Sequence, residues 1–184
     1  YENGEAWDAI NRIAKEESLE LVGLHTHIGT YMLSVNAYRV AVGKLAELAK
    51  RASKKFSITL RYIDIGGGFA SNNTLKGAYY KGQDIVPCFD DYAEAITSEL
   101  INSEPDSSKM PVLILETGRA LVDDAGYLLG TVLANKRLSD GRRSTITDTG
   151  VNILSPPSGM SMKYILPGQH PITSRRQQSM VRYA

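Results

Sequence analysis

Three short motifs gather residue types that could bind a charged ligand. They are HTHIGT at 25–30, DIGGGF at 64–69 and ETGR at 116–119. Each motif follows or ends a short apolar run typical of a buried strand, and the intervals leave room for a helix between one motif and the next. Because ligands of parallel α/β folds bind at the carboxyl ends of the strands, the three motifs predict a single ligand site.

Several of these residues suit a phosphate group. Backbone N–H groups of a glycine run can approach an anion closely, an arginine can donate two parallel hydrogen bonds, and a threonine can add a hydroxyl. The residues concerned are Gly66, Gly67, Gly68, Arg119 and Thr30. The glycine run is no dinucleotide fingerprint, because it lacks the sixth-position glycine and opens a long loop.

Glu116 and His27 call for a second ligand group beside the phosphate. A carboxylate next to a phosphate would be repelled unless it faced a cation elsewhere on the ligand, such as a protonated ring nitrogen. The flat face of His27 could stack on that ring. Phosphate, ring and protonated nitrogen together describe pyridoxal 5'-phosphate, in which a protonated ring is a good electron sink. A simple Glu116–Arg119 ion pair is the alternative, but it leaves the glycines unexplained.

The motifs together resemble the fold-type III pyridoxal-phosphate decarboxylases, diaminopimelate decarboxylases more than eukaryotic ornithine decarboxylases. HTHIG at 25–29, DIGGGF at 64–69, ETGRALV at 116–122 and DTG at 148–150 occur in the family's order. The resemblance implies a (β/α)₈ barrel followed by a β-domain, with sites shared in a homodimer. Thr30, Thr117 and Thr149 depart from the residues usual in the family.

Carried over by position, the resemblance implies a role for each motif. His27 stacks on the cofactor ring and Glu116 contacts the pyridine nitrogen, so both are assigned as catalytic. The residues implied at the phosphate are Thr30, Gly66, Gly67, Gly68, Gly118 and Arg119. His25 is interpreted as a packed or supporting residue, Asp64 as structural or supporting, and the Asp123-Asp124 pair as a solvated turn.

The resemblance also implies residues that the chain does not contain. The family's Schiff-base lysine lies on an early barrel strand, upstream of Tyr1, and a segment carrying a cysteine and an acidic residue begins beyond Tyr183. Lys44, Lys50, Lys54 and Lys55 fall on or just after a helix. We therefore expect the chain to be a portion of a larger enzyme and to be inactive alone.

Apolar periodicity places these motifs in an α/β fold. Helices are expected over 5–18, 34–53 and 89–100, strands over 19–28, 58–65 and 112–116, each buried on both faces, and a loop over 70–86. Residues 1–125 are assigned to the barrel, and 126–184 to the start of a β-domain. Strands are expected there over 127–134 and 144–148, with weaker signals near 163–166 and 179–183.

Composition excludes several classes of protein. The 184 residues include 21 Lys and Arg against 20 Asp and Glu, a net charge of +1 that predicts no nucleic-acid partner. No apolar run approaches the length of a membrane helix, so no membrane partner is expected. A single cysteine, Cys88, favours a cytoplasmic location and, with three histidines, gives no structural zinc pattern, so no metal is expected.

The function predicted on these grounds is decarboxylation of a diamino acid, with meso-diaminopimelate, giving L-lysine, favoured through the resemblance alone. Ornithine, lysine or arginine as substrate remains open. So does a non-catalytic pyridoxal-phosphate-binding relative, which an upstream lysine would exclude. An amino-acid racemase on the same type of barrel is disfavoured, because HTHIG and ETGR resemble decarboxylase motifs.

Overall fold

The computed structural model describes residues 1–73, 79–123, 125–150 and 153. The chain divides into two compact units, one of Tyr1–Asn72 with Gly82–Asp124, the other of Asn73–Lys81 with Ala125–Ala184. Division into a barrel part and a β-domain at residue 125 stays a prediction. The weak strand signals near 163–166 and 179–183 lie outside the described residues.

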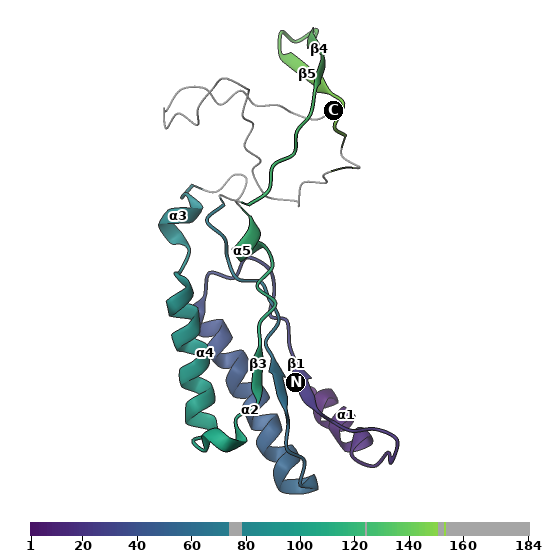
Figure 1. Cartoon of the computed structure of the whole chain (residues 1–184), viewed down its shortest axis with the longest axis vertical. Coiled ribbons are helices and arrows are strands. Elements are labelled where there is room, and N and C mark those ends of the chain that lie inside the picture. The colour runs from purple at the N-terminus through teal and green to yellow at the C-terminus, as the bar shows by residue number, and fades with distance from the viewer. Residues whose placement is uncertain (74–78, 124, 151–152, 154–184) are drawn as a thin grey trace. The chain divides into compact units, whose positions relative to one another are not determined.

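The first unit is built on a parallel sheet of three short strands (Figure 1). These are β1 (Gly23–His25), β2 (Tyr62–Asp64) and β3 (Val112–Ile114), paired in that order. Helix α2 (Val35–Phe56) connects β1 to β2, and α4 (Phe89–Ser103) lies between β2 and β3. Strands that pair in parallel need such crossover connections, so the predicted α/β arrangement is confirmed.

The helices follow their apolar stripes, with different limits from those predicted. α1 (Glu5–Ile13) is shorter than the expected 5–18, because Lys15 and Glu16 already make i→i+3 bonds to Arg12 and Ile13. α2 runs three residues past the expected end, to a left-handed cap at Ser57 with φ 58°. α4 begins at a capping box, in which the Cys88 N–H donates to the Asp91 carboxylate at 2.9 Å.

One face of the sheet is covered by α2 and α4, which run side by side along it (Figure 1). Three aromatic rings form the centre of this core: Tyr38 stacks on Phe69 at 4.7 Å, and Tyr92 meets both rings edge-on. The remaining members of the core are aliphatic side chains, namely Val42, Leu45, Ile63, Ile65, Ile96 and Leu100. This packing fixes α2 and α4 against the sheet.

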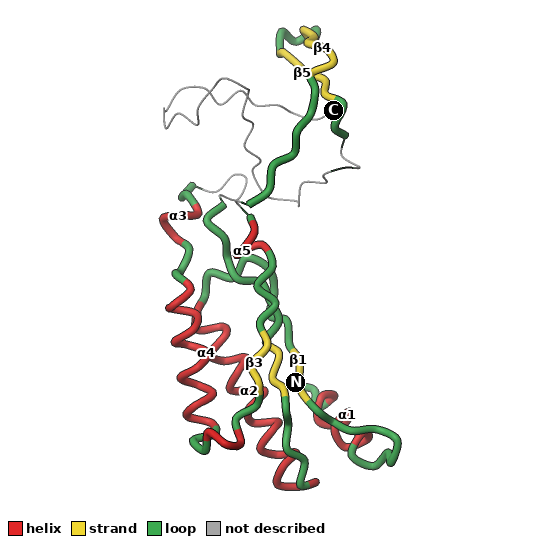
Figure 2. The backbone as a smooth tube through the Cα atoms, viewed as in Figure 1, coloured by secondary structure: helices red, strands yellow, loops and turns green. Residues whose placement is uncertain are grey.

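The opposite face of the sheet is open, which contradicts the expectation of strands buried on both faces. Tyr62, Val112 and Ile114 are 38%, 60% and 37% exposed, whereas Ile63 on the helix side is 2% exposed. The strands are also shorter than predicted (Figure 2). Hydrogen bonds between neighbouring strands nevertheless continue beyond their ends. Three strands are too few to close a barrel, and among the described residues no second layer covers this face.

The structure contains three short helical turns that the sequence analysis did not predict. α3 (Gly82–Ile85) interrupts the segment 70–86 that was expected to be a loop throughout, η1 (Ser107–Lys109) precedes β3, and α5 (Arg119–Val122) follows the ETGR motif. Single turns carry too few residues for a helical period to be seen. Among the described helices, none combines the length and apolar composition needed to cross a bilayer.

The described part of the second unit contains an antiparallel hairpin of β4 (Val132–Arg137) and β5 (Arg143–Thr147). The strand predicted over 127–134 begins and ends later in the structure, at Val132–Arg137. The first strand is displaced toward the charged residues Lys136 and Arg137, which pair with Ser144 and Arg143. The turn closes with the Leu138 N–H donating to the Arg142 carbonyl at 2.8 Å, and Gly141 takes φ 85°. Turn chemistry therefore sets the register, rather than the apolar run before it.

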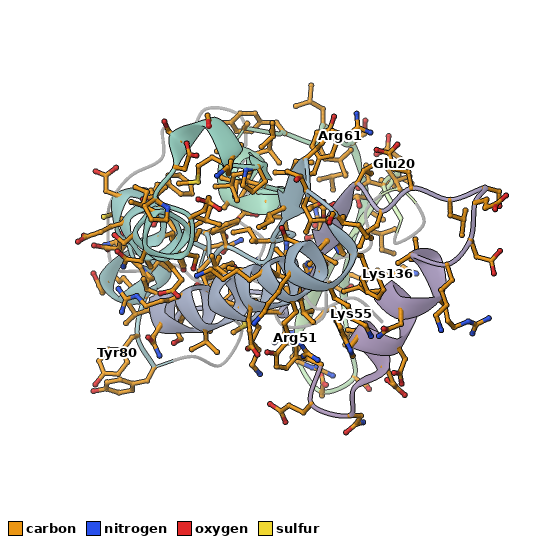
Figure 3. The ribbon with its side chains drawn as sticks, turned by 90° about the horizontal axis from the view of Figure 1, so that it is seen from below. Glu20, Arg51, Lys55, Arg61, Tyr80 and Lys136 are labelled. Atoms are coloured by element: carbon orange, nitrogen blue, oxygen red, sulfur yellow. The ribbon has the colours of Figure 1, made fainter. Side chains whose placement is uncertain are left out.

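The outer surface of α2 packs on α1 through cations and an aromatic ring. The Arg51 guanidinium lies 4.1 Å from the Trp7 ring centroid and the Lys55 ammonium 5.4 Å from it. Figure 3 labels both cations on α2, and Lys55 also donates to Asn11 of α1 at 2.7 Å. Beneath them Ile10 packs on Leu48 and Ala52. The basic end of α2 is thus used to hold α1.

Candidate cofactor site

The three motifs meet where the sheet ends. Beyond the strands, the Thr26 N–H donates to the Asp64 carbonyl at 2.9 Å, and the Glu116 N–H donates to the Gly66 carbonyl at 2.8 Å. The parallel pairing therefore carries all three motifs side by side to the same edge. This is the convergence that the sequence predicted.

His27 contacts the glycine run directly. The Gly67 N–H donates to Nδ1 of His27 at 3.3 Å, so Nδ1 is an acceptor and the proton of the neutral ring lies on Nε2. Gly66 has φ 68°, a conformation that L side chains rarely adopt. A Cβ added to Gly66 would also lie 2.9 Å from Nδ1 of His27. Glycine is thus required for the imidazole to approach the turn.

The next two glycines allow the neighbouring loops to approach as closely. A Cβ on Gly67 would overlap the Glu116 carbonyl oxygen, and one on Gly68 would overlap the Gly29 carbonyl oxygen. Gly66 and Gly67 are buried, and Gly68, with φ 86°, is half-buried. The result is a turn whose backbone is packed between two loops without side chains of its own.

Only part of this turn is available to an anion. The Gly66 N–H donates to Oδ1 of Asp64 at 2.8 Å, and the Gly67 N–H is held by His27. Gly68 is the most exposed of the three glycines. The donor role predicted for the whole run therefore falls mainly on Gly68 in this structure.

Two buried tyrosines support the loops from the helix side. The Tyr38 hydroxyl of α2 donates to the Gly67 carbonyl at 3.0 Å, and the Tyr92 hydroxyl of α4 donates to the Met32 carbonyl at 2.5 Å. Burial raises the pKa of both tyrosines above the ordinary value of 10.0. Both hydroxyls are thus neutral donors near pH 7. Neither tyrosine carried a functional signal in the sequence, where each was only a member of an apolar stripe.

Asp64 and His25 form a second layer beneath the turn. Nδ1 of His25 lies 3.2 Å from Oδ2 of Asp64, whose other oxygen accepts the Gly66 N–H. A ring nitrogen of His25 and one carboxylate oxygen each of Asp64 and Glu116 all lie within 4.8 Å of one another. His25 was expected to be packed or supporting, but its side chain is 53% exposed, because it points to the open face of the sheet.

Asp123 was expected in a solvated turn, but it links two loops of the site. The hydroxyl of Ser71, which is buried after the glycine run, donates to Oδ2 of Asp123 at 2.5 Å. Its charge also contributes, after burial, to the raised pKa of Tyr31 in the loop that follows β1. Asp123 thus interacts with residues of two other loops. A single sequence offers no signal for such a contact.

The other predicted phosphate residues lie on the loops that follow these contacts. Thr30 is exposed in the loop between β1 and α2. Gly118, with φ 51°, precedes α5, and the partly buried Arg119 is the first residue of that helix. The contacts described above unite His27, the glycine turn and Glu116; they do not include Thr30, Gly118 or Arg119.

The geometry suits a flat, anionic ligand. His27 and Glu116 are both exposed and flank a turn that any side chain would fill, so a ring could lie between an imidazole and a carboxylate. The half-buried Gly68 and the guanidinium of Arg119 are groups of the kind that donate to a phosphate. The residues present therefore fit pyridoxal phosphate, and the class of protein they define is an α/β cofactor-binding domain.

Comparison with known proteins agrees with this class. Residues 2–123 match the family model described as pyridoxal-dependent decarboxylase, pyridoxal binding domain. A diaminopimelate decarboxylase of Aquifex aeolicus is 34% identical over 145 residues, which cover 79% of this chain and 31% of that protein. The chain thus spans about a third of the length of the curated relatives it matches.

Solved structures give the same result. The diaminopimelate decarboxylase of Methanocaldococcus jannaschii in complex with L-lysine superimposes with a TM-score of 0.67 and 29% identity, over 85% of this chain and 34% of that one. A lysine decarboxylase of Selenomonas ruminantium superimposes with a TM-score of 0.59 and 26% identity, over 80% of this chain and 35% of that one.

The chain belongs to the pyridoxal-dependent decarboxylase family, and the match lies in its pyridoxal binding domain. The predicted family, its cofactor and the predicted fold class, a part of a (β/α)₈-type barrel, are confirmed. The roles of single residues, and the absence of a metal, stay predictions.

Proposed function

We propose that the protein carrying this chain is a pyridoxal-phosphate-dependent decarboxylase of a diamino acid, with meso-diaminopimelate as the favoured substrate. The observation that carries the proposal is the convergence of His27, the glycine turn and Glu116 at the ends of three adjacent strands. Relatives named diaminopimelate decarboxylase support the choice of substrate.

Each residue of the site has a distinct task in this proposal. Glu116 holds a proton on the pyridine nitrogen, and His27 presents its ring face to the cofactor. Thr30, Gly68, Gly118 and Arg119 bind the phosphate, while Gly66 and Gly67 keep the turn thin enough for the other groups to approach. The bound cofactor supplies an electron sink for the pair of electrons left when CO₂ departs.

The lysine that anchors the cofactor is not among the residues of this site. Lys44, Lys50, Lys54 and Lys55 all lie on α2; Lys44 pairs with Glu2 at 3.0 Å, and Lys55 contacts Asn11 and Trp7. We therefore propose that the lysine belongs to a part of the protein outside this chain, and that the chain alone releases no CO₂. A homodimer with shared sites and a cytoplasmic location complete the proposal.

Replacing Glu116 tests the function at the residue that the chemistry needs. In the complete protein, Glu116→Ala should lower turnover of carboxyl-labelled meso-diaminopimelate on the order of a hundredfold, while pyridoxal phosphate remains bound. The reason is that an unprotonated ring is a poor electron sink. Release of labelled CO₂ measures turnover, and absorbance of the washed protein measures bound cofactor.

A surface carboxylate provides the matched control. Glu20 pairs with Arg61 at 3.7 Å on an exposed part of the first unit (Figure 3), so Glu20→Ala should leave turnover unchanged. Equal turnover of Glu116→Ala and the unmodified protein would remove Glu116 from its role. Bound cofactor without CO₂ release from any of the four diamino acids, namely diaminopimelate, ornithine, lysine and arginine, would instead favour a non-catalytic binder.

A further inference from the structure

A continuous series of contacts crosses the ends of the three strands. It begins at His25, the last residue of β1, whose Nδ1 lies 3.2 Å from Asp64, the last residue of β2. Asp64 accepts the Gly66 N–H at 2.8 Å, and the carbonyl of Gly66 accepts the Glu116 N–H at 2.8 Å. An imidazole on the first strand is thereby linked to the backbone of Glu116 beyond the third.

The cluster holds two acidic side chains and one basic side chain. Asp64 and Glu116 place carboxylate oxygens within 4.8 Å of each other, so the two like charges repel each other. The side chain of Asp64 is 20% exposed. The imidazole of His25 lies within the same 4.8 Å and is the basic group of this cluster. An N–H at Nδ1 of His25 can donate to Oδ2 of Asp64, 3.2 Å away, and hold that carboxylate in place.

The two carboxylate oxygens of Asp64 make separate contacts. Its Oδ1 accepts the Gly66 N–H and so restrains Gly66, the residue whose carbonyl accepts the Glu116 N–H. Its Oδ2 lies 3.2 Å from Nδ1 of His25, so free rotation of the carboxylate is restricted. Without His25, the Gly66 N–H would be the only one of these two contacts left to hold Asp64.

We propose that His25 is a positioning residue of the cofactor site, which acts through Asp64 and Gly66 to orient Glu116 toward the pyridine nitrogen. The proposal rests on the function proposed above, in which Glu116 contacts that nitrogen. His25 itself does not touch the cofactor.

The test compares two replacements of His25 in the complete protein. His25→Leu removes the polar partner of Asp64, whereas His25→Asn keeps an N–H donor near the position of Nδ1. The dissociation constant of pyridoxal phosphate should rise about tenfold in His25→Leu, with a shifted absorbance band of the bound cofactor, because that band reports ring protonation. His25→Asn should stay within about threefold of the unmodified protein and keep its band.

Asp106 offers a closely matched control. It accepts a backbone N–H from Ser108 at 3.0 Å and pairs with Lys109 at 3.1 Å, as Asp64 does with Gly66 and His25, but it precedes β3 at the far end of the sheet. Asp106→Asn should leave both the dissociation constant and the absorbance band unchanged. Asp64→Asn should change both.

The possible outcomes separate this inference from the proposed function. Tight binding with an unshifted band in His25→Leu would overturn the positioning role and leave the proposed function intact. Equal losses in His25→Leu and His25→Asn would also overturn it, because the ring rather than its donor would then matter. Failure of the unmodified protein to bind pyridoxal phosphate would refute the proposed function.

Hydrogen exchange in the cofactor-free protein tests the link from His25 through Asp64 to Gly66, even if the protein does not bind pyridoxal phosphate. Amide hydrogen exchange at Gly66 in the cofactor-free protein should be faster in His25→Leu than in His25→Asn, because Asp64 is less firmly held. Identical exchange in the two variants would overturn the proposed linkage.

Discussion

At the scale of single residues, the site depends on backbone groups held by side chains from the helices. Tyr38 is fully buried in α2, and its hydroxyl is the partner of the Gly67 carbonyl. Gly67 in turn donates to His27, so a side chain that the sequence placed in the core is connected to the ligand site through a single residue. Core and site are therefore not separate sets of residues here.

Tyr38→Phe should destabilise the protein without emptying the core. The ring remains stacked on Phe69, but the buried Gly67 carbonyl loses its partner, at a cost of about 1–3 kcal/mol in the free energy of unfolding. Urea denaturation followed by circular dichroism measures the change. Tyr62→Phe, at a partly exposed tyrosine, should change stability by less than about 0.5 kcal/mol. Equal losses in the two variants would contradict the role given to the Tyr38 hydroxyl.

The raised pKa of Tyr38 gives that residue a pH signature. An unfolded tyrosine loses its proton above its ordinary pKa of 10.0, while burial raises the folded pKa and keeps the proton on. The unfolded state then binds fewer protons, so stability is fully present below pH 10 and falls as pH rises above it, by about 1.4 kcal/mol per pH unit for one such group. Tyr38→Phe should reduce the slope of unfolding free energy against pH between 10 and 11. An unchanged slope would show that Tyr38 ionises equally in both states.

At the scale of elements, the DIGGGF turn shows what glycine spacing can and cannot predict. The sequence predicted a bare backbone that faces an anion, and the structure adds neighbouring carbonyls where side chains would be. The internal bonding of the turn could not be foreseen. Which N–H groups are used by Asp64 and His27 depends on the register of three strands, and single sequences do not specify pairing.

Gly67→Ala isolates the effect of space from that of backbone conformation. Gly67 does not have a positive φ, so alanine is permitted there by its backbone, but its Cβ would overlap the Glu116 carbonyl oxygen. Unfolding should be easier by about 1–3 kcal/mol, and pyridoxal phosphate should bind more weakly because Glu116 is displaced. Thermal unfolding and cofactor fluorescence measure the two effects.

Gly126 provides the control for that substitution. A Cβ on Gly126 would meet no atom within 4 Å, so Gly126→Ala should change stability by less than about 0.5 kcal/mol. A Gly67→Ala variant as stable as Gly126→Ala would show that the turn can relax. Glycine would then be required only at Gly66 and Gly68, because of their positive φ angles.

At the scale of the whole molecule, the sequence predicted the order of helices and strands but not which surfaces are covered. Apolar runs such as 112–116 indicate burial, and in a closed barrel both faces of such a strand would be buried. In this chain β3 packs through Leu113 on the helices, while Val112 and Ile114 face outward. Periodicity identifies apolar positions, but it does not indicate which faces of a strand are covered.

The open face of the sheet predicts how the chain behaves alone. Tyr62, Val112 and Ile114 lie on adjacent strands and form an apolar surface beside unpaired strand edges, an arrangement that promotes self-association. Val112→Thr keeps a β-branched side chain and replaces one methyl group by a hydroxyl. We expect this variant to bind less of an apolar dye and to shift the chain toward lower mass in sedimentation velocity.

Val40→Thr makes the same replacement at an exposed position of α2, outside the sheet, and it should alter neither measurement. If Val40→Thr and Val112→Thr lowered dye binding equally, the dye would report scattered apolar groups rather than the sheet. If the complete protein bound as much dye as the chain alone, the face would be open there too. The remaining strands would then not close over Val112, and the barrel inferred for this family member would have to be incomplete on that side.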